Sequence, residues 1–358
     1  GSRSIRAKAA TSPAPSPMSA LARDLGRIAA ETGFSGVVRV DGPGGSVVVR
    51  AYGLADRAHG ILNAPDTQFG IASGTKGLTA LVVMGLVEND ALSLATPARS
   101  LLGADLPLVD DRVTVEHLLA HRSGIGDYLD EELDQDFSDY LMPVPVQQLA
   151  TTEAYLGVLD GHPQKFAPGE RFGYCNSGYV LLALIAERAA ATSFYDLVRD
   201  LVCVPAGMAD TAFLRSDDLP GRAALGYVRM GGEWRTNVFH LPVRGSGDGG
   251  IYTSAADIAA FWRALFGGSI VREETLAEML RKRSETDRGR GYGLGFWLPA
   301  DGGGAMLQGG DPGVVFRSVH DPRRHATWTF VSNSGEGARA IAERLEQDRT
   351  AGSPSIPR

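Results

Sequence analysis

The sequence of 358 residues has little lysine and little cysteine. Arginine supplies most of the positive charge, and only four lysines are present. The two cysteines, Cys175 and Cys203, are too few for a disulfide scaffold or a cysteine zinc site. Both stand in apolar segments, so two small buried side chains are favoured over a disulfide. Neither disulfides nor cysteine-bound zinc are therefore expected to organise the fold.

Long apolar runs and basic clusters are also missing. Apolar runs such as residues 81–87 are far shorter than a membrane span. The net charge is −7, and no Lys/Arg cluster alternates with aromatic residues as on a nucleic-acid surface. Membrane spans, nucleic acids and anionic membrane surfaces are therefore not expected. The length and the 44% hydrophobic content suit a folded protein of one large domain or two ordinary ones.

The two ends of the chain have the composition of tails. Residues 1–17 are rich in Ala, Ser and Pro, and residues 348–358 are rich in Ser and Pro. The first two residues resemble a cloning remnant, and Met18 is a candidate natural start, which predicts a cytoplasmic protein without a signal peptide. The alternative is that residues 1–17 are the processed stub of an exported protein.

Residue patterns predict an α/β fold whose sheet is built from both ends of the chain. A hairpin is expected at residues 36–53. Further short strands are expected at 250–253, 292–297, 314–319 and 327–332, and helices at 115–121, 179–190, 194–202, 255–266 and 338–347. Strands at both ends with helices between them indicate one sheet interrupted by a helical insertion.

This pattern divides the chain into two lobes. We assign residues 18–78 and 235–347 to an α/β lobe, and residues 79–234 to a mostly helical lobe. The active site is expected in the cleft between them.

One of the four lysines, Lys76, follows Ser73 by three residues in Phe69-Gly-Ile-Ala-Ser-Gly-Thr-Lys. Lysine can lose its proton when it is desolvated, whereas arginine stays protonated. The following segment, 77–92, has no proline and is apolar nearly all round, which is typical of a buried helix. Residues three apart lie on one helical face, so Lys76 can reach the Ser73 hydroxyl. The pattern predicts a nucleophilic serine activated by a lysine.

Two later segments supply groups that such a pair needs. In Tyr174-Cys-Asn176 a phenol can accept and return a proton, and a carboxamide can hold a substrate amide. The alternative is that both residues cap a helix beginning near Ser177. In Gln308-Gly309-Gly310-Asp311 a glycine-rich strand edge can bring a backbone N–H toward that of Ser73 to hold an oxyanion. The alternative there is an ordinary turn.

The three segments occur in the order of a known set of motifs. Ser73-Gly-Thr-Lys76, Tyr174-Cys-Asn176 and Gln308-Gly-Gly310 resemble those of the serine hydrolases that include class C β-lactamases, penicillin-binding proteins and β-lactamase-like carboxylesterases. The similarity runs from about residue 34 to residue 333. It implies a β-lactamase/transpeptidase-like α/β fold, with an antiparallel sheet flanked by helices and a mostly helical inserted lobe.

The resemblance also implies roles for individual residues in a cofactor-free, metal-free enzyme. Ser73 becomes acylated while Lys76 and Tyr174 move the protons. Asn176, Gln308, Gly309 and Gly310 contact the substrate, and the backbone N–H groups of Ser73 and Asp311 form the oxyanion hole. Relatives usually carry Lys or His where this chain has Gln308, and that cation helps to bind a carboxylate. Because Gln308 is uncharged, weak recognition of anionic substrates is expected.

The expected partner is therefore a small-molecule ester, amide or lactam, and a small neutral acyl substrate is favoured. Two alternatives stay open: a D-amino-acid peptidase or β-lactam-binding enzyme, such as a β-lactamase or DD-peptidase, and a non-catalytic binding or sensor domain of the same fold. The sequence does not separate hydrolysis from acyl transfer, which depends on the exclusion of water from the cleft. It also leaves the oligomeric state open.

Other residues invite functional interpretations that we set aside. His117 and His121 have metal-ligand spacing on a predicted helix but lack the accompanying glutamate, so structural roles are favoured. The acidic run 130–136 lacks a calcium-loop pattern and is interpreted as solvated surface. Trp234 and Trp297 suit either the cleft or the core.

Overall fold

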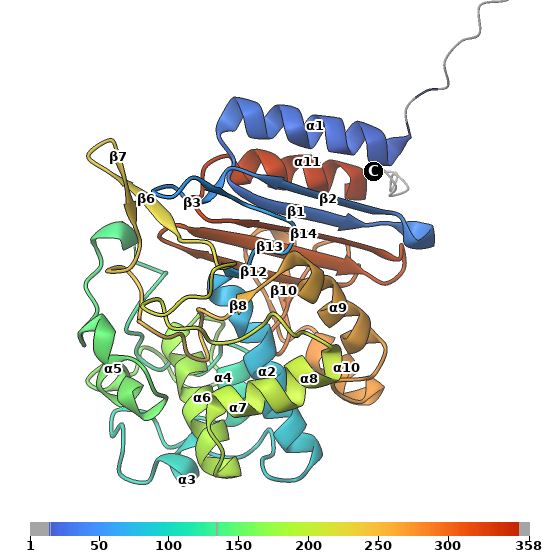
Figure 1. Ribbon diagram of the computed structural model, residues 1–358. Coiled ribbons are helices and arrows are strands. Elements are labelled where there is room, and N and C mark those ends of the chain that lie inside the picture. The colour runs from blue at the N-terminus through green and yellow to red at the C-terminus, as the bar shows by residue number, and fades with distance from the viewer. Residues whose placement is uncertain (1–13, 15, 134, 351–358) are drawn as a thin grey trace, which may run out of the picture.

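The computed structural model describes residues 14, 16–133 and 135–350, and its centre is an eight-stranded antiparallel sheet. The strand order is β2-β1-β14-β13-β12-β11-β10-β9, so β1 and β14, from opposite ends of the chain, lie side by side (Figure 1). The bounds are β1 Gly36–Asp41, β2 Val47–Tyr52, β9 Ser284–Glu285, β10 Gly291–Tyr292, β11 Trp297–Leu298, β12 Ala305–Asp311, β13 Val314–Asp321 and β14 Ala326–Ser332.

Two terminal helices cover one face of this sheet. Helices α1 (Pro17–Thr32) and α11 (Ala338–Thr350) lie side by side above the strands (Figure 1). They bury an apolar cluster that we call the outer core, made of Leu21, Leu25, Ile28, Phe34, Val38, Trp328, Phe330, Ile341 and Leu345 among others. Successive strand residues point to opposite faces, so Val38 joins the outer core while Val37 joins a larger cluster on the other side, the inner core.

The inner core packs the opposite face of the sheet against α9 (Ala255–Phe266), α2 (Thr75–Glu88) and the remaining helices. Those helices are α3 Ala98–Leu102, α4 Val115–Leu119, α5 Leu156–Leu159, α6 Asn176–Ala190, α7 Phe194–Val198, α8 Val204–Ala206 and α10 Glu273–Leu280. Three two-stranded sheets complete the fold: β3 Leu54–Asp56 with β4 Ile61–Leu62, β5 Phe69–Gly70 with β8 Tyr252–Thr253, and β6 Tyr227–Met230 with β7 Glu233–Thr236.

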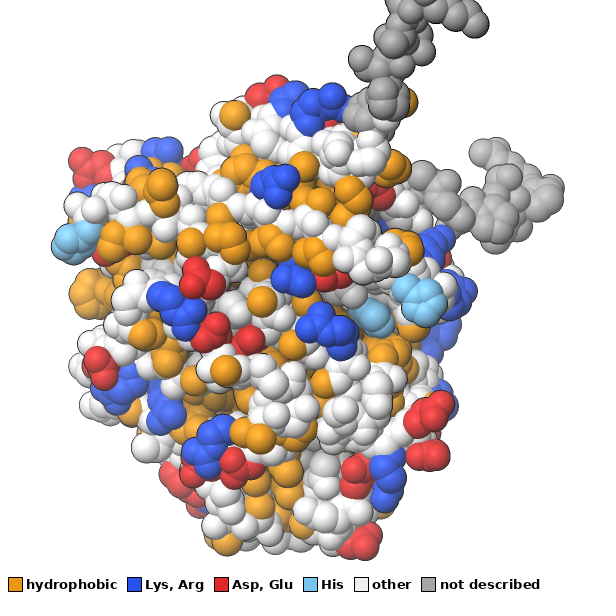
Figure 2. Space-filling view, turned by 45° about the vertical axis from the view of Figure 1, so that its right-hand side comes forward, with side chains coloured by type: hydrophobic (Ala, Val, Ile, Leu, Met, Phe, Trp, Pro, Cys, Tyr) orange, Lys and Arg blue, Asp and Glu red, His pale blue; other side chains and the backbone are white. Residues whose placement is uncertain are grey.

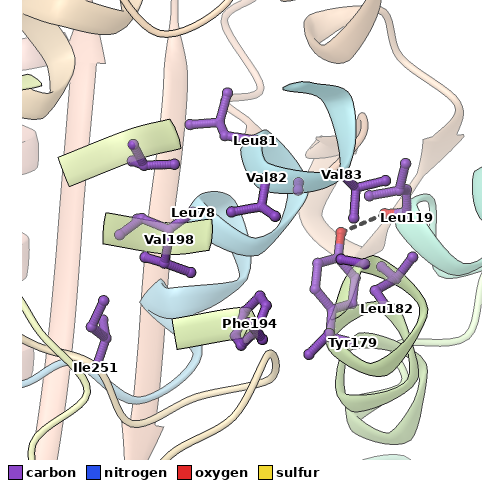
Figure 3. Close-up of a cluster of buried hydrophobic side chains, with 14 of the residues drawn as sticks. Leu78, Leu81, Val82, Val83, Leu119, Tyr179, Leu182, Phe194, Val198 and Ile251 are labelled. Carbon is purple, nitrogen blue, oxygen red and sulfur yellow. Dashed lines mark hydrogen bonds between the residues drawn. The ribbon is translucent and has the colours of Figure 1, made fainter. Parts of the chain in front are cut away.

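Helix α2 is enclosed on nearly every side, as its apolar sequence predicts. Leu78, Leu81, Val82 and Val83 project from it toward α6, α7 and the sheet, and the Tyr179 hydroxyl donates a hydrogen bond to the Leu119 carbonyl at 2.6 Å (Figure 3).

Glycines let the helix approach the sheet closely. A Cβ on Gly77 would lie 2.5 Å from Leu307 Cδ2, and one on Gly74 would lie 2.5 Å from the Phe316 ring. The residues around Ser73 are therefore fixed by a tightly packed scaffold.

Most predicted elements are present, with three corrections. The prediction of a single strand at 292–297 is wrong, because a turn separates β10 from β11. In this turn Gly295 has φ +86°, and its α-carbon packs against Ala80. The predicted helix 115–121 ends at Leu119. Helix α11 continues to Thr350, into the predicted C-terminal tail. The two-lobe division stays a prediction, and β7 straddles its second boundary.

The predicted N-terminal tail lies outside the described residues except for Ala14, Ser16 and Pro17, of which Ser16 caps α1. Within the described ranges, no helix combines the length and apolar character that a bilayer crossing requires. Acidic and basic side chains are interspersed on the face shown in Figure 2.

Candidate active site

Ser73 and Lys76 face each other at the start of α2. The short 3₁₀ turn Ala72–Gly74 leads directly into the helix, and Ala72 has the uncommon left-handed φ of +49°. Lys76 Nζ lies 2.8 Å from Ser73 Oγ. Lys76 is only 2% exposed, whereas Ser73 is partly open to solvent. A concealed amine therefore contacts an accessible hydroxyl, as the spacing predicts.

Two carbonyl oxygens hold the other side of the Lys76 amine. Asn176 Oδ1 and the Asp248 carbonyl oxygen each accept a hydrogen bond from Nζ at 2.8 Å. Neither oxygen can donate a proton, so Ser73 is the only hydroxyl among the three partners. A neutral amine that keeps both carbonyl contacts therefore directs its lone pair at Ser73 Oγ. This arrangement suits Lys76 as a base.

Tyr174 lies beside both Ser73 and Lys76. Its ring lies between those of His121, with centroids 4.4 Å apart, and Trp297, with centroids 5.9 Å apart and planes 20° apart. Burial, opposed by a side-chain hydrogen bond with Ser73, raises the pKa of Tyr174 well above its ordinary value. The Lys76 amine lies 4.7 Å from the ring centroid. The phenol is therefore protonated at neutral pH and placed beside the candidate nucleophile.

His121 fixes the loop that carries Tyr174. Its Nδ1 accepts the Cys175 N–H at 3.0 Å, and its carbonyl oxygen accepts the Gly173 N–H at 2.8 Å. Burial is the main cause that holds the pKa of His121 well below its ordinary value. The ring is therefore neutral, with its proton on Nε2. A φ of +55° at His121 turns the chain sharply after α4.

Asp127 holds the start of α6. Its carboxylate accepts the backbone N–H groups of Asn176 at 3.0 Å and Ser177 at 2.9 Å. Burial raises the pKa of Asp127 to about 6, although these backbone donors oppose the rise. The alternative that Tyr174 and Asn176 cap the helix is therefore not what the structure shows, since Asp127 does so from a distant loop.

The Asn176 amide is held by its neighbours. Its Nδ2 donates to the Leu129 carbonyl at 2.9 Å and to Glu131 Oε2 at 2.7 Å. Glu131 is exposed, as are Glu132, Gln135 and Asp136, so the interpretation of the acidic run 130–136 as solvated surface is confirmed for these residues. Asp130 is only partly exposed and pairs with Lys165 at 2.9 Å. Asp134 lies outside the described residues.

The third motif approaches Ser73 through its glycines. A Cβ on Gly309 would lie 2.5 Å from the Ser73 nitrogen, so Gly309 packs directly against the Ser73 backbone. Its neighbour Gln308 points to the opposite face of β12, as the alternation of a strand requires. The Gln308 side chain is therefore directed away from the inner core, toward Arg290 and Arg317.

The register of the β12–β13 hairpin bears on the oxyanion site. Asp311 pairs with Val314 across a two-residue turn, so the Asp311 N–H is directed at β13. Hydrogen-bonding direction alternates along a strand, and the Gly310 N–H is therefore directed at the free edge of β12 beside Ser73. The register favours Gly310 over Asp311 as the partner of the Ser73 N–H. Burial, together with Asp248 and Glu131, raises the pKa of the Asp311 carboxyl to about 7.

Two cavities meet at Ser73. The first, here called the acyl pocket, is lined by mostly apolar side chains and also by Asp248 and Asp311. Its aromatic and aliphatic lining includes Phe69, Tyr128, Phe137, Leu214, Leu241 and Tyr252. The second, here called the arginine cleft, is lined by Tyr174, Trp297, Gln308 and three arginines. A substrate bound at Ser73 can extend into both.

Several residues that the sequence analysis set aside have clear roles. His117 completes a capping box with Thr114 in α4, and His121 lies beyond that helix. Trp297 lines the cleft. Trp234 lies away from the cleft, where it packs against Tyr227 and beneath the guanidinium groups of Arg57 and Arg229. Both cysteines are free and buried, as favoured. Among the described residues, no group of three or more His, Cys, Asp or Glu is arranged to hold a metal ion.

Sequence reasoning missed the residues that support the site, namely Asp127, Tyr128, Glu131 and Asp248, and the role of His121. The Tyr128 hydroxyl bonds to the Asp248 carboxylate, which burial keeps at a raised pKa. For Asp248 the sequence held one signal. Glycines flank it in Gly247-Asp-Gly-Gly250, and glycines often mark a place where another backbone segment approaches closely. The others had no local signal.

Comparisons with known proteins show the family and the fold. The family profile described as Beta-lactamase matches residues 20–352. Esterase EstB from Burkholderia gladioli is 32% identical over 289 residues, which are 69% of this chain and 70% of that protein. Putative penicillin-binding protein PbpX from Bacillus subtilis (strain 168) is 27% identical over 268 residues, which are 75% of this chain and 63% of that protein.

Solved structures show the same relationship. A penicillin-binding protein from Bacillus halodurans has a TM-score of 0.85 at 35% identity, covering 90% of this chain and 99% of that chain. A D-amino acid amidase from Ochrobactrum anthropi SV3 has a TM-score of 0.78 at 24% identity, covering 94% of this chain and all of that one, which is a likeness of fold.

Proposed function

Since the chain belongs to the β-lactamase family of serine hydrolases, we propose that it forms a covalent acyl-enzyme on Ser73 and acts as an esterase, amide hydrolase or transacylase. The contact of 2.8 Å between Lys76 Nζ and Ser73 Oγ carries this proposal, because it pairs a buried amine with a partly exposed hydroxyl. The similarity to an esterase at 32% identity supports it.

Acylation begins with proton transfer from Ser73 to Lys76. The Ser73 oxygen attacks the substrate carbonyl carbon, and the carbonyl oxygen gains negative charge. The backbone N–H groups of Ser73 and Gly310 stabilise that charge, and removal of one such donor typically slows a reaction by roughly 10²–10³-fold. The bond to the leaving group then breaks, and Tyr174 donates a proton to the departing oxygen or nitrogen.

Deacylation reverses these roles. A water molecule or an acceptor amine loses a proton to the Tyr174 phenolate and attacks the acyl carbon. The bond to Ser73 Oγ then breaks, and Lys76 returns its proton to that oxygen. The phenol returns to its protonated form because its pKa is raised. Water gives hydrolysis, and an amine gives acyl transfer.

The acyl pocket supports a small, largely apolar acyl group. Tyr128, Phe137 and Leu241 are among its lining residues, and Asn176 stands at its junction with Ser73. Burying a side chain-sized apolar group stabilises a complex by roughly 1.5–3 kcal/mol. Short-chain acyl esters are therefore suitable first substrates.

The test is pre-steady-state hydrolysis of p-nitrophenyl butyrate. A burst of nitrophenol close to one equivalent per protein is expected, followed by slower turnover. The Ser73→Ala variant should show neither phase while keeping its circular dichroism spectrum. Absence of a burst and of turnover in the folded wild-type protein would contradict the proposal.

A second candidate is a β-lactam-binding enzyme or D-amino-acid peptidase, favoured by similarity to proteins named as penicillin-binding. Incubation with a fluorescent penicillin separates the two candidates. Rapid labelling that Ser73→Ala abolishes would favour this second candidate, and slow labelling without turnover would favour a binding or sensor role.

A further inference from the structure

Glu131 lies where the two cavities meet. Among the described residues, only Ser73, Glu131 and Gly310 line both the acyl pocket and the arginine cleft. Ser73 is the candidate nucleophile, and the Gly310 N–H is the candidate partner of the Ser73 N–H in the oxyanion site. Glu131 is an exposed residue of a turn in the loop that follows α4. A carboxylate therefore stands beside the carbonyl group of any substrate that reaches Ser73.

The Asn176 amide has no donor to spare for a substrate. Its Oδ1 accepts a hydrogen bond from Lys76 Nζ at 2.8 Å, so its Nδ2 faces the other way. The two hydrogens of Nδ2 go to the Leu129 carbonyl at 2.9 Å and to Glu131 Oε2 at 2.7 Å. The reverse orientation would direct the amide oxygen at two acceptors. A substrate carbonyl can therefore bind Asn176 only by displacing Leu129 or Glu131.

Glu131 is difficult to displace in this way. A hydrogen bond to a carboxylate is stronger than one between neutral groups, so a neutral substrate carbonyl is a poor replacement for Glu131. Asn176 and Leu129 line the acyl pocket and do not line the arginine cleft, so the Glu131 oxygen that Asn176 holds lies on the acyl side. An acyl group that carries a carbonyl acceptor near the reacting carbon is therefore disfavoured.

Other polar groups of the acyl pocket are also acceptors. Asp248 and Asp311 line it, and the Asp311 carboxyl makes no hydrogen bond or ion pair with a described residue. Two phenols of the lining are committed to the protein, because Tyr128 donates to the Asp248 carboxylate and Tyr155 donates to the Arg244 carbonyl at 2.5 Å. A donor with positive charge is the group that complements such a lining.

We propose that Glu131 determines specificity on the acyl side, by accepting a hydrogen bond from an ammonium group near the reacting carbonyl and by keeping Asn176 from binding a carbonyl acceptor there. Preferred substrates are then esters or amides whose acyl group carries a cationic nitrogen on the carbon next to the carbonyl, followed by a short apolar chain. This inference rests on the proposed function. It gives Glu131 the substrate contact that the family resemblance assigns to Asn176.

Three phenyl esters with acyl chains of equal length test the preference. Phenyl pentanoate is apolar, phenyl 4-oxopentanoate carries a ketone acceptor, and phenyl N-ethylglycinate carries an ammonium group. Each kcat/KM is divided by the rate of hydroxide-catalysed hydrolysis, because the ammonium group activates its ester. We expect the corrected value for the N-ethylglycinate to exceed that for the pentanoate by roughly ten- to a hundredfold, the effect of one charge-assisted hydrogen bond.

The 4-oxopentanoate should react more slowly than the pentanoate. Equal corrected values for all three esters, or a preference for the 4-oxopentanoate, would overturn the inference.

Two variants assign the preference to Glu131. Glu131→Gln removes the charge but keeps an oxygen that can accept from Asn176, whereas Glu131→Ala frees the Asn176 donor. Both should lower the ratio of N-ethylglycinate to pentanoate by roughly tenfold or more. Glu131→Ala should also raise the ratio of 4-oxopentanoate to pentanoate by roughly two- to tenfold, because the freed N–H can bind the ketone. Unchanged ratios, or an equal loss of rate for all three esters, would contradict the assignment.

The neighbouring glutamate supplies a matched control. Glu132 lines the arginine cleft but pairs with Lys165 at 2.8 Å and with Arg171 at 3.2 Å. Glu132→Gln removes the same charge one position away and should keep both wild-type ratios. A fall in the N-ethylglycinate ratio as large as that in Glu131→Gln would reveal a general effect of charge and reject a specific contact.

A binding measurement separates failure of this inference from failure of the proposed function. If the wild-type protein hydrolyses none of the esters and acquires no acyl group on Ser73, the proposed function fails. Calorimetric titration with N-ethylglycinamide, which keeps the cationic acyl part, then tests Glu131 directly. Binding at least tenfold weaker in Glu131→Gln than in the wild type supports the inference. Equal binding by the two proteins, or no binding by either, rejects it.

Discussion

At the residue scale, the proposed role of Lys76 as a base depends on its lone pair and not on its charge. The two carbonyl acceptors at 2.8 Å hold the amine in place, and Ser73 is the remaining partner. Lys76→Arg keeps the positive charge but cannot release a proton. We predict that it lowers the rate of acylation by roughly 10²–10⁴-fold, as does Lys76→Ala. Stopped-flow hydrolysis of p-nitrophenyl butyrate checks this. A Lys76→Arg protein that is acylated nearly as fast as the wild type would exclude Lys76 as the base.

The candidate reacting residues were recognisable in the sequence, and the residues that support them were not. Ser73, Lys76, Tyr174 and Asn176 stand in local spacings that a helix turn or a loop converts directly into proximity. His121 acts on a loop more than 50 positions later, so its role depends on tertiary contacts. The same holds for Asp127, which caps α6 from a similar separation.

At the element scale, the start of α6 makes stability depend on pH. The Asp127 pKa is about 6 in the folded protein and near 3.8 when unfolded. The folded state therefore binds the proton more tightly, and stability falls as pH rises from about 4 to about 6. The change corresponds to at most about 3 kcal/mol.

The Asp127→Asn variant tests this origin. Asparagine does not titrate, so the difference in unfolding free energy between variant and wild type should change with pH between 4 and 6 and be constant above 7. Urea unfolding at a series of pH values measures it. A difference that stays constant over the whole range would contradict the assigned pKa.

The packing of α2 on the sheet distinguishes two glycines of one helix. Gly77→Ala places a methyl group 2.5 Å from Leu307 Cδ2, which forces the sheet side chain to move, at a cost of about 1–3 kcal/mol. Gly85→Ala places its methyl group 3.5 Å from Leu201, an ordinary contact, and should stabilise the helix by about 0.5–1 kcal/mol. Thermal unfolding of the pair checks this. The account of a tight α2–sheet contact would be wrong if both changes stabilised the protein equally.

Elements with strong local periodicity were predicted well, as α9 at residues 255–266 illustrates. The segment 292–297 was predicted as one strand because it alternates large and small residues. Gly295 instead turns the chain where it meets Ala80 of α2. That contact is nonlocal, so no pattern within the segment could reveal it.

At the scale of the whole molecule, the sheet separates two cores that should contribute differently to stability and activity. Leu25 in the outer core and Leu78 in the inner core are both 0% exposed. Truncation of either to alanine should cost about 2–5 kcal/mol of unfolding free energy. Leu25→Ala should keep the wild-type burst amplitude at 20 °C, because α1 lies on the face away from Ser73. Leu78→Ala, two residues from Lys76, should reduce it.

The opposite distribution, with lost activity in Leu25→Ala and full activity in Leu78→Ala, would show that the outer core governs the site.

The central claim is that Ser73 carries the acyl group during turnover. The most direct measurement is intact mass spectrometry of protein quenched within the burst of p-nitrophenyl butyrate hydrolysis, followed by peptide mapping. We expect one butyryl group per protein, located on Ser73, absent from Ser73→Ala, and lost again as substrate is exhausted. Turnover of the ester without any adduct, or with an adduct on another residue, would contradict the account.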